Sequence, residues 1–279
     1  MPARTRAWQA GGPLYGLSSW CMTRRQMFAA AAGGSFAMAS AQEPPKNSFF
    51  ELRYYHMRNS RANQVRRTTE FLSQGYAPAA KRAGIGPVGI FSASIAPETP
   101  FLLVASGHPS LGGMQTSLEK LAADAEYQKA LADYNAPADL AYIRMESALF
   151  RCLDAVPKIE VAPTEGRGAR TFELRTYESD NETTLRRKVK MFNEGEIAIF
   201  RRAGLQPVFF GEAIVGSNLP RITYMVAYDG MAGHDKAWAA FGADPEWRKL
   251  STAPGNSDAE IVANISNSIL RPAAGSEIR

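Results

Sequence analysis

Hydrophobic and polar residues alternate over residues 49–57, and the stretch is rich in aromatic and branched side chains, so it predicts a strand. Apolar residues then recur at helical spacing from Val65 to Ala83, and Gly84 follows where a helix favours a left-handed end. The elements expected next are two strands, a mostly helical region and a last strand, at about 87–95, 101–107, 110–134 and 142–151. The order β-α-β-β-α-β is that of the ferredoxin-like fold.

The whole pattern recurs about 120 residues later. The run FELRYY at 50–55 returns as FELRTY at 172–177, and the run that begins at Asp124 returns at Asp244. Such self-similarity predicts a duplicated domain. The expected segments are a first copy, a linker rich in Pro and Gly, a second copy and a C-terminal tail, at 49–151, 152–169, 170–272 and 273–279.

Each predicted copy carries both of its helical regions on one face of a four-stranded sheet, so its other face needs a cover. We therefore expect an α+β fold in which two tandem ferredoxin-like β-α-β-β-α-β repeats pack their antiparallel sheets face to face as an α/β barrel. The alternation places successive side chains of each first strand on opposite faces of the sheet. Four apolar residues are predicted to lie under the helices: Phe50, Leu52, Phe172 and Leu174. The polar residues between them are then predicted inside the barrel: Glu51, Arg53, Tyr55, Glu173, Arg175 and Tyr177.

The N-terminal residues have the pattern of an export signal. Arg24-Arg25 precedes a short apolar run, and Ala39-Ser40-Ala41 provides a small-x-small cleavage site. The paired arginines resemble a twin-arginine signal, so we expect a signal peptide at 1–41, a mature tail at 42–48 and a periplasmic or secreted protein. Translation from Met22 would keep the whole signal. A mitochondrial transit peptide is the alternative, because the segment contains arginine and no acid. The apolar run is too short for a stable membrane span.

Charge argues against a nucleic-acid partner. The formal net charge is +5, but four arginines lie in residues 1–41, which contain no acid, so the rest is nearly neutral. Nucleic-acid binding needs a concentrated basic face. We interpret Arg186, Arg187 and Lys188 as the solvated side of an amphipathic helix. Of the two cysteines, only Cys152 follows the signal, so no internal disulfide is expected.

The sequence resembles the NIPSNAP family, whose fold belongs to the dimeric α/β-barrel class. The resemblance is carried by Glu-Leu-Arg-x-Tyr at 51–55 and 173–177, and by Asp-Pro-Glu-Trp-x-Lys at 244–249. The first copy departs from the second motif, with Ala125 and Tyr127 in place of Pro and Trp. The resemblance implies the barrel fold. It also implies mitochondrial association and protein partners for eukaryotic members, and no assigned activity for most bacterial ones.

The two Glu/Arg/Tyr sets are the candidate ligand-binding residues: Glu51, Arg53, Tyr55, Glu173, Arg175 and Tyr177. Convergent polar groups in an enclosed space can orient a small ligand or hold a proton-transfer carboxylate. The alternative, which we favour, is a structural ion pair that locks the two sheets.

The remaining chemistry is sparse. His56, His108 and His234 do not share repeat positions or metal-ligand spacing, so we predict no metal and interpret them as hydrogen-bonded structural residues. No catalytic nucleophile is recognisable and no cofactor motif is present, although haem is left open. The sequence favours an exported barrel that binds a small hydrophobic molecule or a protein and is compatible with a homo-oligomer. The alternative is a cofactor-independent monooxygenase- or isomerase-like enzyme that uses the polar residues inside the barrel.

Overall fold

The computed structural model describes residues 47–59, 61, 63–163 and 170–279, which belong to one compact unit spanning Glu43–Arg279. The predicted signal peptide at 1–41 and most of the mature tail at 42–48 lie outside the described residues. In the part of the chain that is described, no helix combines the length and apolar character needed to cross a membrane.

The first half of the chain folds in the predicted order. A long helix follows the first strand and contains a π-helical segment, η1, between its two α-helical parts, and Gly84 ends it with a left-handed φ of 83°. The elements of this half are β1 (Phe49–His56), α1 (Gln64–Glu70), η1 (Phe71–Tyr76), α2 (Ala77–Ala83), β2 (Val88–Ile95), β3 (Phe101–His108), α3 (Leu111–Ala123), α4 (Ala125–Asn135) and β4 (Arg144–Cys152).

The second half repeats this order, including the π-helical segment and a left-handed glycine, Gly204, with φ 96°. Its elements are β5 (Thr171–Glu178), α5 (Glu182–Met191), η2 (Phe192–Glu196), α6 (Ile197–Ala203), β6 (Gln206–Val215), β7 (Arg221–Tyr228), α7 (Gly230–Ala243), α8 (Pro245–Ser251), α9 (Asp258–Ile261) and β8 (Asn264–Pro272).

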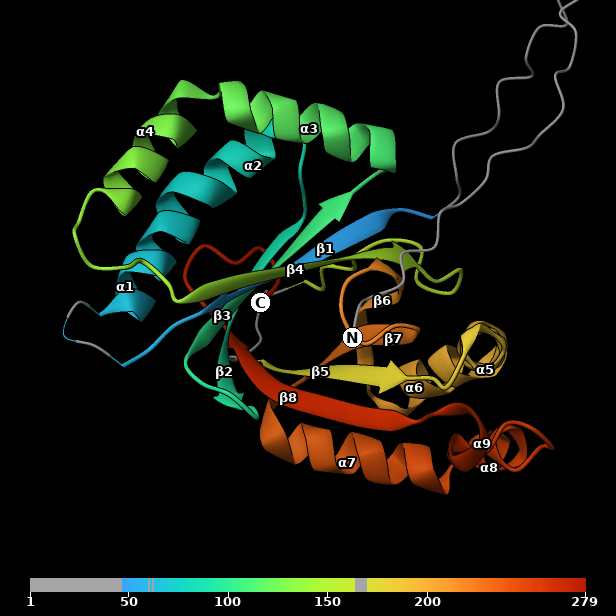
Figure 1. Cartoon of the computed structure of the whole chain (residues 1–279). Coiled ribbons are helices and arrows are strands. Elements are labelled where there is room, and N and C mark those ends of the chain that lie inside the picture. The colour runs from blue at the N-terminus through green and yellow to red at the C-terminus, as the bar shows by residue number, and fades with distance from the viewer. Residues whose placement is uncertain (1–46, 60, 62, 164–169) are drawn as a thin grey trace, which may run out of the picture. The chain divides into compact units, whose positions relative to one another are not determined.

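The two sheets join into one closed barrel with the strand order β1-β3-β2-β8-β5-β7-β6-β4. All the strand pairings are antiparallel. Two short pairings, β2 with β8 and β4 with β6, connect the halves. The helices of the halves cover opposite outer sides of the barrel (Figure 1). The predicted fold class, α+β with ferredoxin-like units forming an α/β barrel, is confirmed.

The barrel interior is filled with apolar side chains from both halves. The Phe50 ring stacks on Phe150 at 4.9 Å and contacts Phe209 at 4.6 Å. A Cβ atom at Gly211 would lie 2.5 Å from the Phe50 ring, so glycine is needed for this packing. The predicted faces were therefore wrong: the residues that point into the barrel are Phe50, Leu52, Phe172 and Leu174, whereas the Glu/Arg/Tyr sets face the helices.

The physical reason is the difference between the two spaces. The middle of the barrel is closed by strands all round, so it suits the apolar residues that fill it there. The layer between a sheet and its helices is open along its rim, where Arg53 and Arg175 keep 23% and 16% of their side-chain surface exposed. A strand face that carries charges is therefore less costly under the helices than inside the barrel.

Residues of the predicted linker and C-terminal tail pack against the barrel. Leu153 and Val156 are buried under the second-half helices. The Ile278 side chain is buried in the barrel core. The tail also extends the pairing of β2, because the backbone N–H of Val88 donates to Oε2 of Glu277 at 2.6 Å.

Candidate functional site

The structure places the two predicted polar sets in two equivalent layers, one under each pair of helices. Glu51 pairs across the strands with Ser106 and Leu149, and Glu173 pairs with Val226 and Ile269. Both carboxylates are buried between the sheet and the helices. The two sets do not meet in the barrel, so the chain contains two separate polar clusters.

In the second half, the carboxylate of Glu173 is fully surrounded by donors. Arg175 donates to its Oε1 at 2.8 Å, and Asn267 donates to the same atom at 3.2 Å. Tyr228 and Trp238 donate to Oε2 at 2.9 and 2.8 Å. Burial alone would raise the pKa of Glu173, but Arg175 and these hydrogen bonds outweigh it and lower the pKa. This carboxylate is therefore ionised and fully partnered.

Arg175 connects Glu173 to the aromatic residues of this layer. Its guanidinium stacks over the Trp238 ring at 4.7 Å, and its Nη2 donates to the Tyr177 hydroxyl at 3.3 Å. That hydroxyl also accepts a hydrogen bond from Tyr224 at 2.9 Å. The predicted set Glu173, Arg175 and Tyr177 is thus a continuous buried network. The expected ion pair forms, but it lies under the helices of one half and does not lock the two sheets together.

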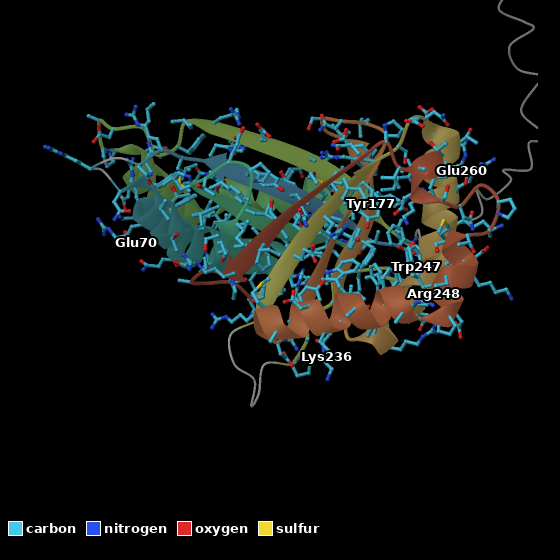
Figure 2. All side chains as sticks on the ribbon, turned by 90° about the horizontal axis from the view of Figure 1, so that it is seen from below. Glu70, Tyr177, Lys236, Trp247, Arg248 and Glu260 are labelled. Carbon is cyan, nitrogen blue, oxygen red and sulfur yellow. The ribbon has the colours of Figure 1, made fainter. Side chains whose placement is uncertain are left out.

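A buried ion pair lies beside this network. Nζ of Lys188 donates to Oε2 of Glu196 at 3.0 Å, and the two side chains are 1% and 2% exposed. The Tyr177, Phe192 and Trp247 rings surround the ammonium group at 5.2, 4.9 and 5.6 Å. Figure 2 labels two of these residues, Tyr177 and Trp247. Burial lowers the pKa of Lys188, but Glu196 outweighs it and raises the pKa, so the lysine is charged. The prediction that Lys188 is solvated was wrong.

The corresponding cluster in the first half has fewer internal contacts. Arg53 donates to Oε1 of Glu51 through Nε at 3.1 Å and through Nη2 at 2.8 Å, and Ser147 donates to the same carboxylate. Nearby, the Tyr76 and Ser106 hydroxyls share a hydrogen bond of 2.9 Å. Burial raises the pKa of Tyr76 to about 12, so this hydroxyl remains protonated at neutral pH.

His108 is the residue that distinguishes this cluster. It ends β3, it is 2% exposed, and neither ring nitrogen has a hydrogen-bond partner among the described residues. Burial lowers its pKa, so the ring is neutral at pH 7 and offers one donor and one acceptor. The sequence-based interpretation of His108 as a hydrogen-bonded structural residue was wrong. The signal was present in the repeat, since Tyr228 occupies the same place at the end of β7.

The halves differ at the positions that close the layer. Trp238 covers Glu173 from α7, whereas the position 120 residues earlier, on α3, holds Leu118, which is 38% exposed and has no polar group. His234, whose Nε2 lies 3.4 Å from Glu173, corresponds to Met114. The first-half layer therefore has an apolar rim above a polar floor and fewer donors for its carboxylate.

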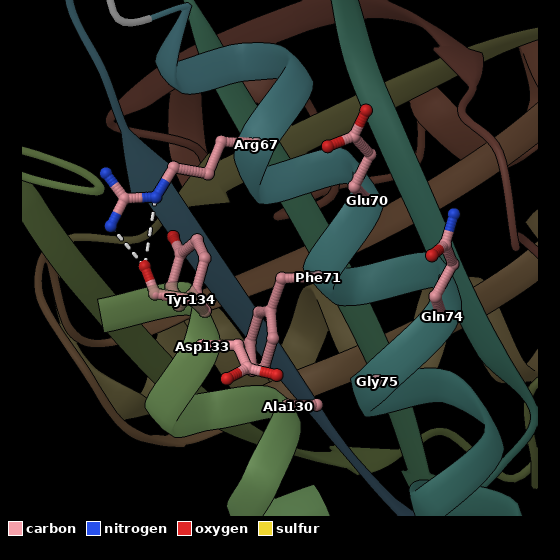
Figure 3. A pocket seen from close by; sticks show the side chains of 8 residues that line it. All are labelled: Arg67, Glu70, Phe71, Gln74, Gly75, Ala130, Asp133 and Tyr134. Atoms are coloured by element: carbon pink, nitrogen blue, oxygen red, sulfur yellow. Dashed lines mark hydrogen bonds between the residues drawn. The ribbon is translucent and has the colours of Figure 1, made fainter. Parts of the chain in front are cut away.

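A second feature common to the halves is a groove between the π-helical segment and the following helix pair. In the first half it has a volume of about 410 Å³ (Figure 3). Nε of Arg67 donates to the Tyr134 carbonyl at 2.9 Å, and the Phe71 ring stacks on Tyr134 at 4.3 Å. Because Arg67 and Tyr134 brace the helices against each other, we interpret this groove as part of the packing. The residues that line it are Arg67, Glu70, Phe71, Gln74, Gly75, Ala130, Asp133 and Tyr134.

Metal chemistry finds no support in the described residues, which contain no group of three His, Cys, Asp or Glu side chains arranged to hold an ion. Cys152 is buried, and burial raises the pKa of its thiol to about 11, which makes it a poor nucleophile at neutral pH.

Comparison with known proteins gives a family match in the second half. Residues 172–277 match the model of the NIPSNAP family, which confirms the resemblance for that half. None of the curated proteins compared with the chain matches it.

Two solved structures of candidate bacterial monooxygenases share the fold at low sequence identity, and a NIPSNAP structure matches over a smaller part of the chain. A candidate monooxygenase from Fusobacterium nucleatum subsp. nucleatum ATCC 25586 aligns with a TM-score of 0.53 and 8% identity, covering 81% of this chain and 93% of that one. Another, from Lactobacillus acidophilus NCFM, aligns with a TM-score of 0.53 and 10% identity over 82% and 97%. A NIPSNAP family protein of unknown function from Agrobacterium tumefaciens str. C58 aligns with a TM-score of 0.36 and 20% identity over 40% and 95%.

Proposed function

We propose that the chain as a whole is an exported NIPSNAP-like protein that binds a small, largely hydrophobic molecule in the first-half layer, above Glu51 and Arg53. The observation that carries the proposal is His108, a buried imidazole whose two nitrogens have no partner in the described part of the chain. Buried polar groups in proteins are nearly always hydrogen-bonded, and leaving one unpaired costs about 1–3 kcal/mol. A ligand that supplies the missing partner would recover that free energy.

The second half serves as the reference for a layer whose carboxylate is fully partnered. There the residue that ends β7, Tyr228, reaches the carboxylate of Glu173, and Trp238 covers it. In the first half, His108 makes no such contact and Leu118 covers the rim without a polar group. Ligand groups that could complete this layer are an apolar body against Met114 and Leu118 and a hydroxyl or carbonyl group that pairs with His108.

Export is proposed from the leader sequence alone, in which Arg24 and Arg25 precede the apolar run. The test is fractionation of a bacterial host that produces the full chain. We expect the mature protein in the periplasm or the medium, and retention in the cytoplasm when both arginines are replaced by lysine. Full-length protein in the cytoplasm of the unaltered strain would contradict export.

Ligand binding is tested by native mass spectrometry of the full chain purified without denaturation. We expect a bound small molecule, its loss in His108→Phe, which fills the space and removes both nitrogens, and its retention in the matched control Tyr228→Phe. Equal ligand occupancy in both variants would show that the ligand does not bind at His108. The absence of any bound mass, together with no thermal shift from a panel of phenols and quinones, would refute the proposal.

A second candidate is a cofactor-independent oxygenase-like enzyme at the same place. The observation that favours it is the neutral state of His108, because a neutral imidazole can accept the proton of a ligand hydroxyl. The names of two structurally similar proteins suggest oxygen chemistry as the first assay. Oxygen uptake with a quinol that is abolished in His108→Phe but not in Tyr228→Phe would support catalysis. Binding without oxygen uptake would leave the protein a binder.

A further inference from the structure

One end of the barrel interior carries charged side chains. At this end β1 and β5 finish while β4 and β7 begin, and their inward-facing residues come together. We call this group the barrel mouth and define it as the set Tyr54, His56, Glu146, Glu178 and Arg221. It lies on the barrel side of the sheet, whereas the Glu51 and Glu173 clusters lie on the helix side.

Arg221 is the arginine of the barrel mouth, and it forms no ion pair with any residue that the structure describes. Its guanidinium lies over the Phe150 ring at 5.4 Å, and its Nε is buried without a hydrogen-bond partner among the described residues. A Cβ atom at Gly216 would lie 3.2 Å from Nη2, so the turn between β6 and β7 passes close to the guanidinium. The group is thus held in place by packing, while its Nε–H makes no hydrogen bond to a described residue.

The two nearby carboxylates are engaged elsewhere. Oε1 of Glu146 accepts from Nε of Arg144 at 2.5 Å and lies 3.5 Å from Nε2 of His56. Oε1 of Glu178 accepts from Asn218 at 3.1 Å and from Asn264 at 3.2 Å. Both carboxylates contribute to the field at Arg221, yet neither forms an ion pair with it. A half-buried cation without an ion-pair partner is costly, so the charge of Arg221 is incompletely compensated by the described residues.

Tyr54 supplies a second donor at this place. It is packed against the barrel core next to Arg221, and burial raises the pKa of its hydroxyl to about 12. The hydroxyl is therefore protonated at neutral pH. Arg221 is not required by the fold at this strand position, because the position 120 residues earlier holds Phe101, a core residue.

We infer that the barrel mouth binds the carboxylate of a small organic acid between the guanidinium of Arg221 and the hydroxyl of Tyr54. Guanidinium and carboxylate groups match in shape and bind through paired hydrogen bonds. A monoanion is favoured over phosphate, because Glu146 and Glu178 already place negative charge nearby and a second ligand charge would be repelled. This site is separate from the one around His108, so it adds to the proposed function and does not depend on it.

The test is calorimetric titration of the full chain with benzoate, acetate and inorganic phosphate at low ionic strength. We expect saturable benzoate binding that weakens roughly tenfold or more in Arg221→Met and less in Arg221→Lys and Tyr54→Phe. The matched control is Arg151→Met, which changes an exposed arginine on β4 and should leave the affinity unchanged. His108→Phe should also leave it unchanged, which separates this proposal from the proposed function.

Thermal unfolding is a second test, because it also shows whether the Arg221→Met variant is folded. Arg221→Met removes an uncompensated charge, so without ligand it should melt no lower than the wild type, and benzoate should raise the melting temperature of the wild type alone. Benzoate binding that is absent in the wild type, or equal in Arg221→Met, would overturn the inference. Tighter binding of phosphate than of benzoate would overturn the choice of a monoanion.

Discussion

The two helix-side layers start from the same strand motif and end in different states. Glu173 is partnered by Arg175, Tyr228, Trp238 and Asn267, whereas Glu51 is partnered by Arg53 and Ser147. Both motifs read Glu-x-Arg-x-Tyr, so the difference comes from residues on other strands and helices. A repeated motif therefore fixes where a polar cluster lies, and the surrounding residues decide how many hydrogen-bond partners its carboxylate has.

The largest difference in stability between equivalent substitutions is expected at the buried Lys188. Lys188 occupies the position that holds Thr68 in the first half, where the threonine shares a 2.9 Å hydrogen bond with Tyr134. Removing one partner of a buried ion pair is strongly destabilising, so Lys188→Ala should lower the free energy of unfolding by about 3–5 kcal/mol. The matched change Thr68→Ala should lower it by about 1 kcal/mol. Urea denaturation measures both, and similar losses would remove the contrast.

A smaller difference is expected at the two arginines of the strand motifs. Arg175→Ala leaves the Glu173 charge buried and should cost about 2–3 kcal/mol, because hydrogen bonds to charged groups are among the stronger ones. Arg53→Ala should cost about 1–2 kcal/mol, since this side chain is more exposed and water can replace part of it. Thermal and urea unfolding of the two variants decide the order, and a larger loss at Arg53 would contradict it.

Exchanging the rim residues should make the halves alike. Trp238→Leu removes a hydrogen bond to Glu173 and the ring under Arg175, so it should cost about 1–2 kcal/mol. Leu118→Trp places an indole over Glu51 and should lower ligand occupancy with little change in stability. Native mass spectrometry reads the occupancy. Full occupancy in Leu118→Trp would show that the ligand does not enter beneath this rim.

The smallest effects are expected where the halves agree. Asp124 caps α4 and pairs with Arg82 of α2, and Asp244 caps α8 and pairs with Arg202 of α6. Hydrogen bonds from these arginines lower both aspartate pKa values to about 2. The folded pKa lies below the usual value, so this stabilisation is present above about pH 4 and is lost as the pH falls towards 2. Asp124→Asn and Asp244→Asn should reduce stability equally at pH 7 and converge on the wild type near pH 2, and unequal losses at pH 7 would contradict the equivalence.

The fold could be predicted from the sequence because it depends on periodicity and on the repeat. The direction of each strand face could not, since Phe50-Glu51-Leu52-Arg53 alternates equally well for either assignment. The direction of each strand face depends on which of the two enclosed spaces excludes more water, and that is a property of the closed barrel. His108 and Lys188 were misjudged for a related reason: the exposure and hydrogen bonding of a side chain depend on neighbours from distant segments, such as Glu196 and the rings around it.

The last residues of the chain complete a strand of the first half. The amide of Ile90 donates to Oγ of Ser276 at 3.0 Å, and the amide of Glu277 donates to the Val88 carbonyl at 2.9 Å. Residues 276 and 277 are synthesised after all eight strands of the barrel. Until they emerge from the ribosome, this part of the β2 edge is unsatisfied, and a variant that lacks residues 273–279 would leave it open to other strands.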